Sequence, residues 1–179
     1  AYTKDLVSGK LIGNIAPAWE TGFMLDALDK TSYSGQWRVA QLPSFGGSNM
    51  TGPDGGSGVA VVKGCKYPAQ AMQFNDWFNT QVNDLATQGL VPAAKGQVTT
   101  PTKMKKQFGG QDVMAELAKA NEKLDSQFGY IPGFTAVGTK MNEKAADAAS
   151  GKAKVGDIFQ IAQGTSVQAL KDAGLPVNG

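Results

Sequence analysis

The segment GGSGVAVVKGCKYPAQA, residues 55–71, decides the fold expected for this chain. It opens at the end of a loop, 44–58, that holds six glycines. The run VAVVK at 59–63 is short, apolar and rich in β-branched residues, which is typical of a buried strand. Pro68 then stands where the first turn of a helix tolerates proline. The sequence therefore predicts a glycine-rich loop, a strand and a helix in direct succession.

Two more strands are expected on the N-terminal side of this segment. KLIGNI at 10–15 and QWRVAQL at 36–42 are apolar or β-rich, and Pro17 and Pro43 follow them as strand breakers. Between these strands a helix is expected from Thr21, whose side chain suits the N-cap position.

Three longer helices are expected on the C-terminal side. Apolar residues recur at helical spacing from about 111 to 124, from 137 to 148 and from 155 to 173. A loop rich in aromatic residues, 127–133, separates the first two of these helices. Strands and helices in this mixed order make the chain α/β or α+β.

The first helix after the glycine-rich loop is expected to bury one face. Ala71, Phe74 and Phe78 recur at helical spacing on that face, so we expect them in the core. We expect Trp77, which lies beside them, and Trp37 in the core as well.

The composition excludes most catalytic machinery. The 179 residues include no histidine and one cysteine, Cys65, so the chain cannot build a Ser-His-Asp or Cys-His triad, a structural zinc site or an internal disulfide. No carboxylate pair stands in a recognisable catalytic arrangement. We therefore expect no enzyme activity, no metal site and no cofactor. The net charge is only +2, and the cluster Lys103, Lys105 and Lys106 fits a solvated surface better than a nucleic-acid face.

The sequence shows no targeting or membrane segment. It opens AYTKD, without the basic start and apolar run of a signal peptide. No apolar run approaches the ~18 residues that a membrane span needs. We expect either a mature chain or one whose front has been removed.

The order of several short segments resembles a known family. NIAPAW at 14–19, WRVAQLP at 37–43 and the segment at 55–71 follow a pattern: a strand ending in tryptophan, a W-x-V-A-x-L-P strand, and a GGSG strand with its helix. The tail, 145–151 with LKDAG at 170–174, fits the same pattern. The chain is thus similar to the second half of an extracellular solute-binding protein of the sugar-binding, maltose-binding-like group, which serves ABC importers.

This resemblance implies an α/β fold of the periplasmic-binding-protein-like type (type II), with most of the first lobe missing from this chain. It implies a second-lobe segment at 1–54, a hinge crossing with a first-lobe strand and helix at 55–91, and a second-lobe helical segment at 92–179. The chain would be a clipped fragment, or a partner chain would complete it. Because a chain that lacks most of its first lobe exposes the apolar surface of the remaining part, we expect dimerisation or strand exchange.

The resemblance also implies a sugar site. A sugar presents apolar C–H faces, which an aromatic ring covers, and hydroxyls, which polar groups bind. Trp19 lies in a loop past a strand end, where α/β proteins bind ligands, and Glu20 beside it would bind hydroxyls. Gly56 and Ser57 lie where the family's chain crosses beside the cleft, so a backbone approach and a hydroxyl are available there.

Two further ligand-binding residues, Tyr130 and Phe134, fall where the family carries cleft aromatics. The family often has tryptophan there, so this chain departs from the pattern in the type of ring.

The function implied is non-catalytic capture of a mono- or oligosaccharide between two lobes, for delivery to the membrane subunits of an ABC importer. Such a protein is extracellular, a cell-surface lipoprotein or periplasmic, and nucleic acid is not a partner. Two alternatives stay open. One is a solute-binding protein for a peptide, polyamine or metal chelate, which few cleft aromatics would favour. The other is a protein-docking module on the same fold, in which Trp19 would be buried or would face a protein surface.

Overall fold

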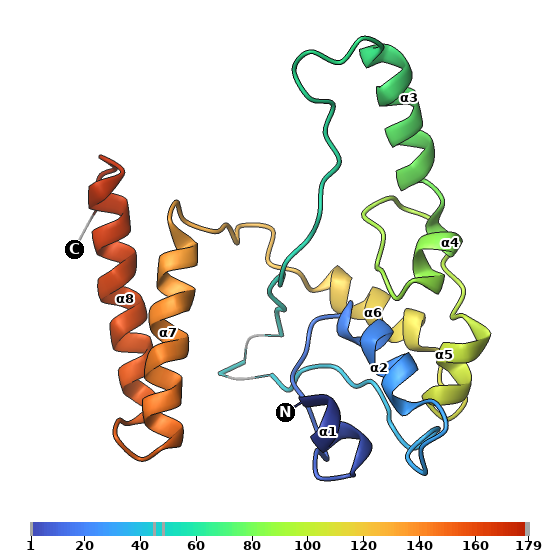
Figure 1. Ribbon diagram of the computed structural model, residues 1–179, viewed down its shortest axis with the longest axis horizontal. Helices are drawn as coiled ribbons and strands as arrows, with labels where there is room; N and C mark the ends of the chain where they lie inside the picture. The colour runs from blue at the N-terminus through green and yellow to red at the C-terminus, as the bar shows by residue number, and fades with distance from the viewer. Residues whose placement is uncertain (1, 45, 48, 178–179) are drawn as a thin grey trace. The chain divides into compact units, whose positions relative to one another are not determined.

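The computed structural model describes residues 2–44, 46–47 and 49–177, which form eight helices (Figure 1). The chain divides into two compact units, Ala1–Ser126 and Gln127–Gly179, and each is described by itself. The helices of the first unit are α1 (Tyr2–Val7), α2 (Glu20–Leu28), α3 (Pro68–Asn79), α4 (Val82–Thr87), α5 (Thr102–Gln107) and α6 (Val113–Glu122). The second unit holds α7 (Phe134–Ala149) and α8 (Val155–Asp172).

The core of the first unit forms where short amphipathic helices meet. Its largest fully buried apolar side chains come from α1, α2, α5 with its C-cap residue Phe108, and the start of α6. Each is removed from water almost completely, which stabilises a helix of six to ten residues that would be marginal alone. These side chains are Leu6, Leu28, Met104, Phe108 and Val113.

A polar network fixes the start of α6 against this core. Asp112 is the N-cap residue, and its carboxylate accepts hydrogen bonds from the Ala115 backbone N–H and the Thr100 hydroxyl. The Thr100 hydroxyl in turn accepts from the Met114 N–H at 2.9 Å. The hydrogen bond from Thr100, followed by that from Ala115, lowers the pKa of Asp112 below its ordinary value.

The three strands expected at 10–15, 36–42 and 59–63 do not form, so the predicted α/β character is absent from the described part of the chain. The pairing there is one isolated parallel bridge, between Thr51 and Leu124. A strand needs a neighbour to accept its backbone hydrogen bonds, and β-branched composition alone does not supply one. The apolar side chains of two of these segments consequently face solvent: Ile12 is 96% exposed and Val62 is 74% exposed.

The segment 36–42 is held by side chains instead of a strand. The Gln111 side-chain amide donates to the Val39 carbonyl at 2.7 Å and accepts from the Val39 N–H at 2.8 Å. The Gln41 amide donates to the Glu116 carbonyl at 2.8 Å. Trp37, expected in the core, does pack against the core cluster.

Helix α3 begins at Pro68 as expected, but the prediction that it buries one face is wrong. No residue of α3 is buried. Phe74, Trp77 and Phe78 are 59%, 56% and 41% exposed, and their rings contact one another along the helix. Periodicity identifies the apolar face of a helix but not whether another element covers it.

The three shortest helices escape sequence reasoning. α1, α4 and α5 have six residues each, which is too short to show an apolar period. The helix expected from Thr21 begins one residue earlier, with Trp19 at the N-cap position, and the Thr21 hydroxyl donates to the Ala18 carbonyl instead of capping.

The second unit is a hairpin of α7 and α8, which lie side by side in opposite directions (Figure 1). Both helices were expected, and α7 begins three residues before the apolar stripe that predicted it. Val137 of that stripe is buried. Gly133 sits at the N-cap of α7 in the left-handed conformation (φ 77°), and a Cβ there would lie 3.2 Å from the Ala169 Cβ of α8. Glycine thus allows the start of α7 to press against the end of α8.

Among the described residues, no helix combines the length and apolar character that crossing a bilayer requires. The segments assigned above to two lobes remain a prediction.

Candidate functional site

A pocket of about 410 Å³ lies between α1 and α2. Two of the residues expected to bind ligand, Trp19 and Glu20, line it. Trp19 is 42% exposed, so part of its ring is available to a ligand. The other lining residues are Tyr2, Thr3, Phe23 and Ala27.

The Trp19 ring is held from two sides. Its Nε1–H donates to the Asp54 carbonyl at 3.1 Å. It also makes an edge-to-face contact with the Phe23 ring, with centroids 5.7 Å apart and planes at 82°. Because an indole N–H and an edge-to-face contact both fix orientation, the ring is set before any ligand arrives. Phe23, 69% exposed, adds a second apolar surface at right angles to the first.

The polar part of this pocket is built around Glu20. Asn14 Nδ2 donates to the Tyr2 hydroxyl oxygen at 3.4 Å. Burial, and after it the interaction of the Tyr2 hydroxyl with the Glu20 carboxylate, raises the pKa of Tyr2 above its ordinary value. A carboxylate has about four acceptor positions, so Glu20 retains acceptors for a donor such as a hydroxyl.

The glycine-rich loop runs beside Trp19. The indole bond ends on Asp54, and a Cβ on Gly55 would lie 3.6 Å from the indole nitrogen. Gly56 and Ser57 follow directly and are exposed, although neither lines the pocket. Gly56 has φ 121°, which glycine alone adopts readily. The structure thus brings Trp19, Glu20 and the start of the 54–57 segment together.

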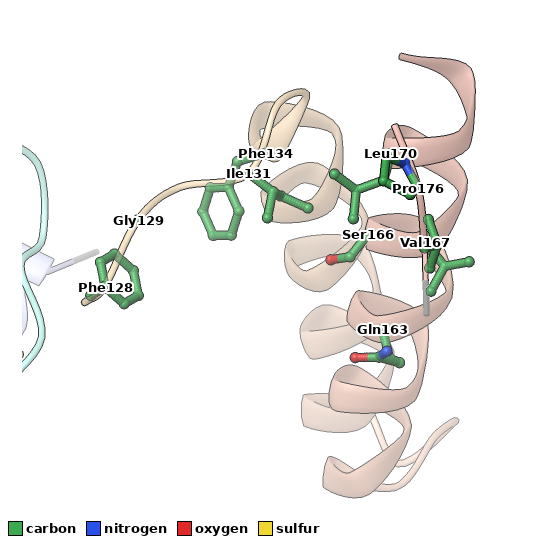
Figure 2. Close-up of a pocket in the computed structure, with 10 residues that line it drawn as sticks. Phe128, Gly129, Ile131, Phe134, Gln163, Ser166, Val167, Leu170 and Pro176 are labelled. Atoms are coloured by element: carbon green, nitrogen blue, oxygen red, sulfur yellow. The ribbon is translucent and has the colours of Figure 1, made fainter. Parts of the chain in front are cut away.

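The remaining expected residues, Tyr130 and Phe134, meet in the second unit. Their ring centroids are 5.0 Å apart, and Phe128 meets Tyr130 edge-to-face at 5.1 Å. Phe128 and Phe134 line a pocket of about 420 Å³, which Figure 2 shows between the 128–134 segment and α8. Tyr130 packs between the two phenylalanines.

Sequence reasoning missed Tyr2, Phe23 and Phe128. Phe23 lies in the helix expected from Thr21 and follows Trp19 by four positions, which puts both rings on one helix face. That spacing could have identified it. Tyr2 gave no signal, because α1 was not expected. Within the described residues no group of three potential ligands could hold a metal ion.

Comparison with known proteins finds similarity among solved structures. No protein-family model matches the chain, and no curated protein matches it. Among solved structures, the galacto-N-biose-/lacto-N-biose I-binding protein of the ABC transporter from Bifidobacterium longum, in complex with lacto-N-biose, matches with 50% identity and a TM-score of 0.90. The match covers 99% of this chain and 44% of that protein.

The chain resembles an ABC-transporter solute-binding protein. The resemblance predicted from the sequence is therefore confirmed. The chain spans less than half the length of this relative, and the residues expected to bind ligand stay predictions.

Proposed function

We propose that this chain takes part in the non-catalytic capture of a carbohydrate by a solute-binding protein of an ABC importer. The observation that carries the proposal is the Trp19 pocket, in a chain half identical to part of a protein solved with lacto-N-biose. A neutral mono- or oligosaccharide is the ligand class, and no bond in it is broken.

The pocket chemistry supports a sugar. The Trp19 and Phe23 rings offer apolar surface to the C–H face of a pyranose, and Glu20 accepts from its hydroxyls. Gly56 and Ser57 extend this surface along the loop that Trp19 holds, and Tyr130 with Phe134 supplies aromatic surface in the second unit.

The complete protein, in this proposal, has the two-lobed α/β fold of type II binding proteins. Residues 1–54 and 92–179 belong to its second lobe, and 55–91 cross into the first. Closure on the sugar is the signal that the transporter's membrane subunits read, outside the cytoplasmic membrane. The remainder of the first lobe then provides the strand partner that the segment 59–63 lacks.

Tryptophan fluorescence during titration with lacto-N-biose and a panel of other sugars tests this proposal. We expect a saturable change in the wild-type chain. Trp19→Ala should abolish that change or weaken binding about tenfold, since a half-buried aromatic ring contributes roughly 1.5 kcal/mol and 1.4 kcal/mol is a factor of ten. Trp77→Ala, the same change on exposed α3, serves as the matched control and should bind as the wild type does.

Equal binding by the two variants would contradict a site at Trp19. Saturable binding of peptides or polyamines in place of sugars would contradict the ligand class.

A further inference from the structure

The second unit holds a pocket whose lining residues, apart from Phe134, the proposal above does not use. We infer that the α7–α8 pocket is a separate carbohydrate subsite, in which Gln163 and Ser166 bind hydroxyl groups beside Phe128 and Phe134. The ligand class rests on the proposed function; the location rests on the pocket itself.

One wall of the pocket is set by backbone geometry. The left-handed Gly133 turns the chain into α7 and lets it approach Ala169 of α8, which fixes the distance between the 128–134 segment and α8. Phe128 and Phe134 stand on this wall with 45% and 39% of their surface exposed. Because Tyr130 contacts both rings, their orientation is set by aromatic packing.

The opposite wall, on α8, carries two polar side chains. Gln163 and Ser166 project from α8 at positions i and i+3, one helical turn apart (Figure 2). Among the described residues neither side chain has a hydrogen-bond partner, whereas Gln168 on the same helix donates to Asp172 at 2.7 Å. The amide and the hydroxyl each donate and accept, which matches the hydroxyls of a sugar.

The other lining residues restrict the chemical class and the size of the ligand. They are Gly129, Ile131, Val167, Leu170, Pro176 and Val177. No lining residue carries a charge, so a carboxylate, phosphate or ammonium group would lose hydration without gaining an ion pair. The volume of about 420 Å³ falls at the lower end of the range for small-molecule sites, roughly 300–1,000 Å³, which favours one or two sugar rings over a longer chain.

The test is a titration of the ¹⁵N-labelled full chain with lacto-N-biose, followed by NMR. We expect saturable shifts of the Gln163 side-chain amide and the Ser166 backbone amide. Gln163→Ala, read at Ser166, and Ser166→Ala, read at Gln163, should each weaken binding about fivefold, because one hydrogen bond contributes roughly 1 kcal/mol. Gln168→Ala, the same truncation away from the pocket, should bind like the wild type.

Three results would overturn the inference. If Trp19 fluorescence responds while the Gln163 and Ser166 signals do not move, this subsite is absent and the proposed function stands. If neither responds to any sugar, both ideas are wrong. If cyclohexanol shifts the Gln163 amide as strongly as the disaccharide does, the pocket is an unselective apolar cleft.

Discussion

Gly133 offers the sharpest test of how the second unit is built. Its φ of 77° lies in the left-handed region, and an added Cβ would approach the Ala169 Cβ to 3.2 Å. Alanine in that conformation costs about 1–2 kcal/mol. The contact is shorter than the ~3.5–4.0 Å optimum for two carbons and adds to that cost. We therefore expect Gly133→Ala to destabilise the hairpin by about 2 kcal/mol.

Gly138 provides a control in the same helix. It lies inside α7, and a Cβ there would meet nothing within 4 Å. Because alanine is favoured over glycine in a helix interior by about 1 kcal/mol, Gly138→Ala should stabilise the hairpin. The same replacement should thus change stability in opposite directions at two positions five residues apart.

Amide hydrogen exchange is the appropriate assay, since it resolves the hairpin from the helices of the first unit. At 1.4 kcal/mol per factor of ten, the most protected amides of α7 and α8 should exchange about thirtyfold faster in Gly133→Ala and about fivefold slower in Gly138→Ala. Equal rates in the two variants would refute both the left-handed turn and its close contact with α8.

Two further outcomes are expected. Asp112→Ala should cost the first unit about 1 kcal/mol at neutral pH, measured by urea unfolding against Glu122→Ala at the other end of α6. Because its folded pKa is lowered, the wild-type advantage is present above the unfolded value of about 3.9 and should fade as the pH falls below it; a constant difference would contradict the cap. The chain should also self-associate through the exposed rings of α3, and Phe74→Ser with Phe78→Ser should reduce this in light scattering; a clean wild-type monomer would show the expectation to be wrong.

The sequence predicts the helices that carry a long apolar period and misses the six-residue helices α1, α4 and α5. α7 and α8 are long enough for the period to show, and Pro68 marks the start of α3. The expected strand at 59–63 fails for a different reason. Its composition suits a β-strand, but a strand forms only when a neighbouring segment pairs with it. No other described segment pairs with residues 59–63.

Some residues of the candidate site could also be predicted from the sequence, and others only from the structure. Trp19 and Glu20 could be predicted because they are adjacent in the sequence and follow a family pattern. Tyr2 could not, because it reaches Glu20 only through the packing of α1 on α2. Gln163 and Ser166 resemble any other polar positions on a helix surface until the hairpin places two phenylalanines opposite them.

The exposed, β-rich runs have a practical consequence for the protein in solution. Residues 10–15 and 59–63 form no strand and expose apolar side chains, and unpaired segments of this composition associate edge to edge once chains meet. Lys10 and Lys63 stand in these runs as charged gatekeepers. Mutual repulsion between molecules vanishes where the net charge does, near the isoelectric point of about 8.6. Solubility should therefore be lowest in mildly alkaline buffer, and concentrated samples keep best at a pH one to two units more acidic.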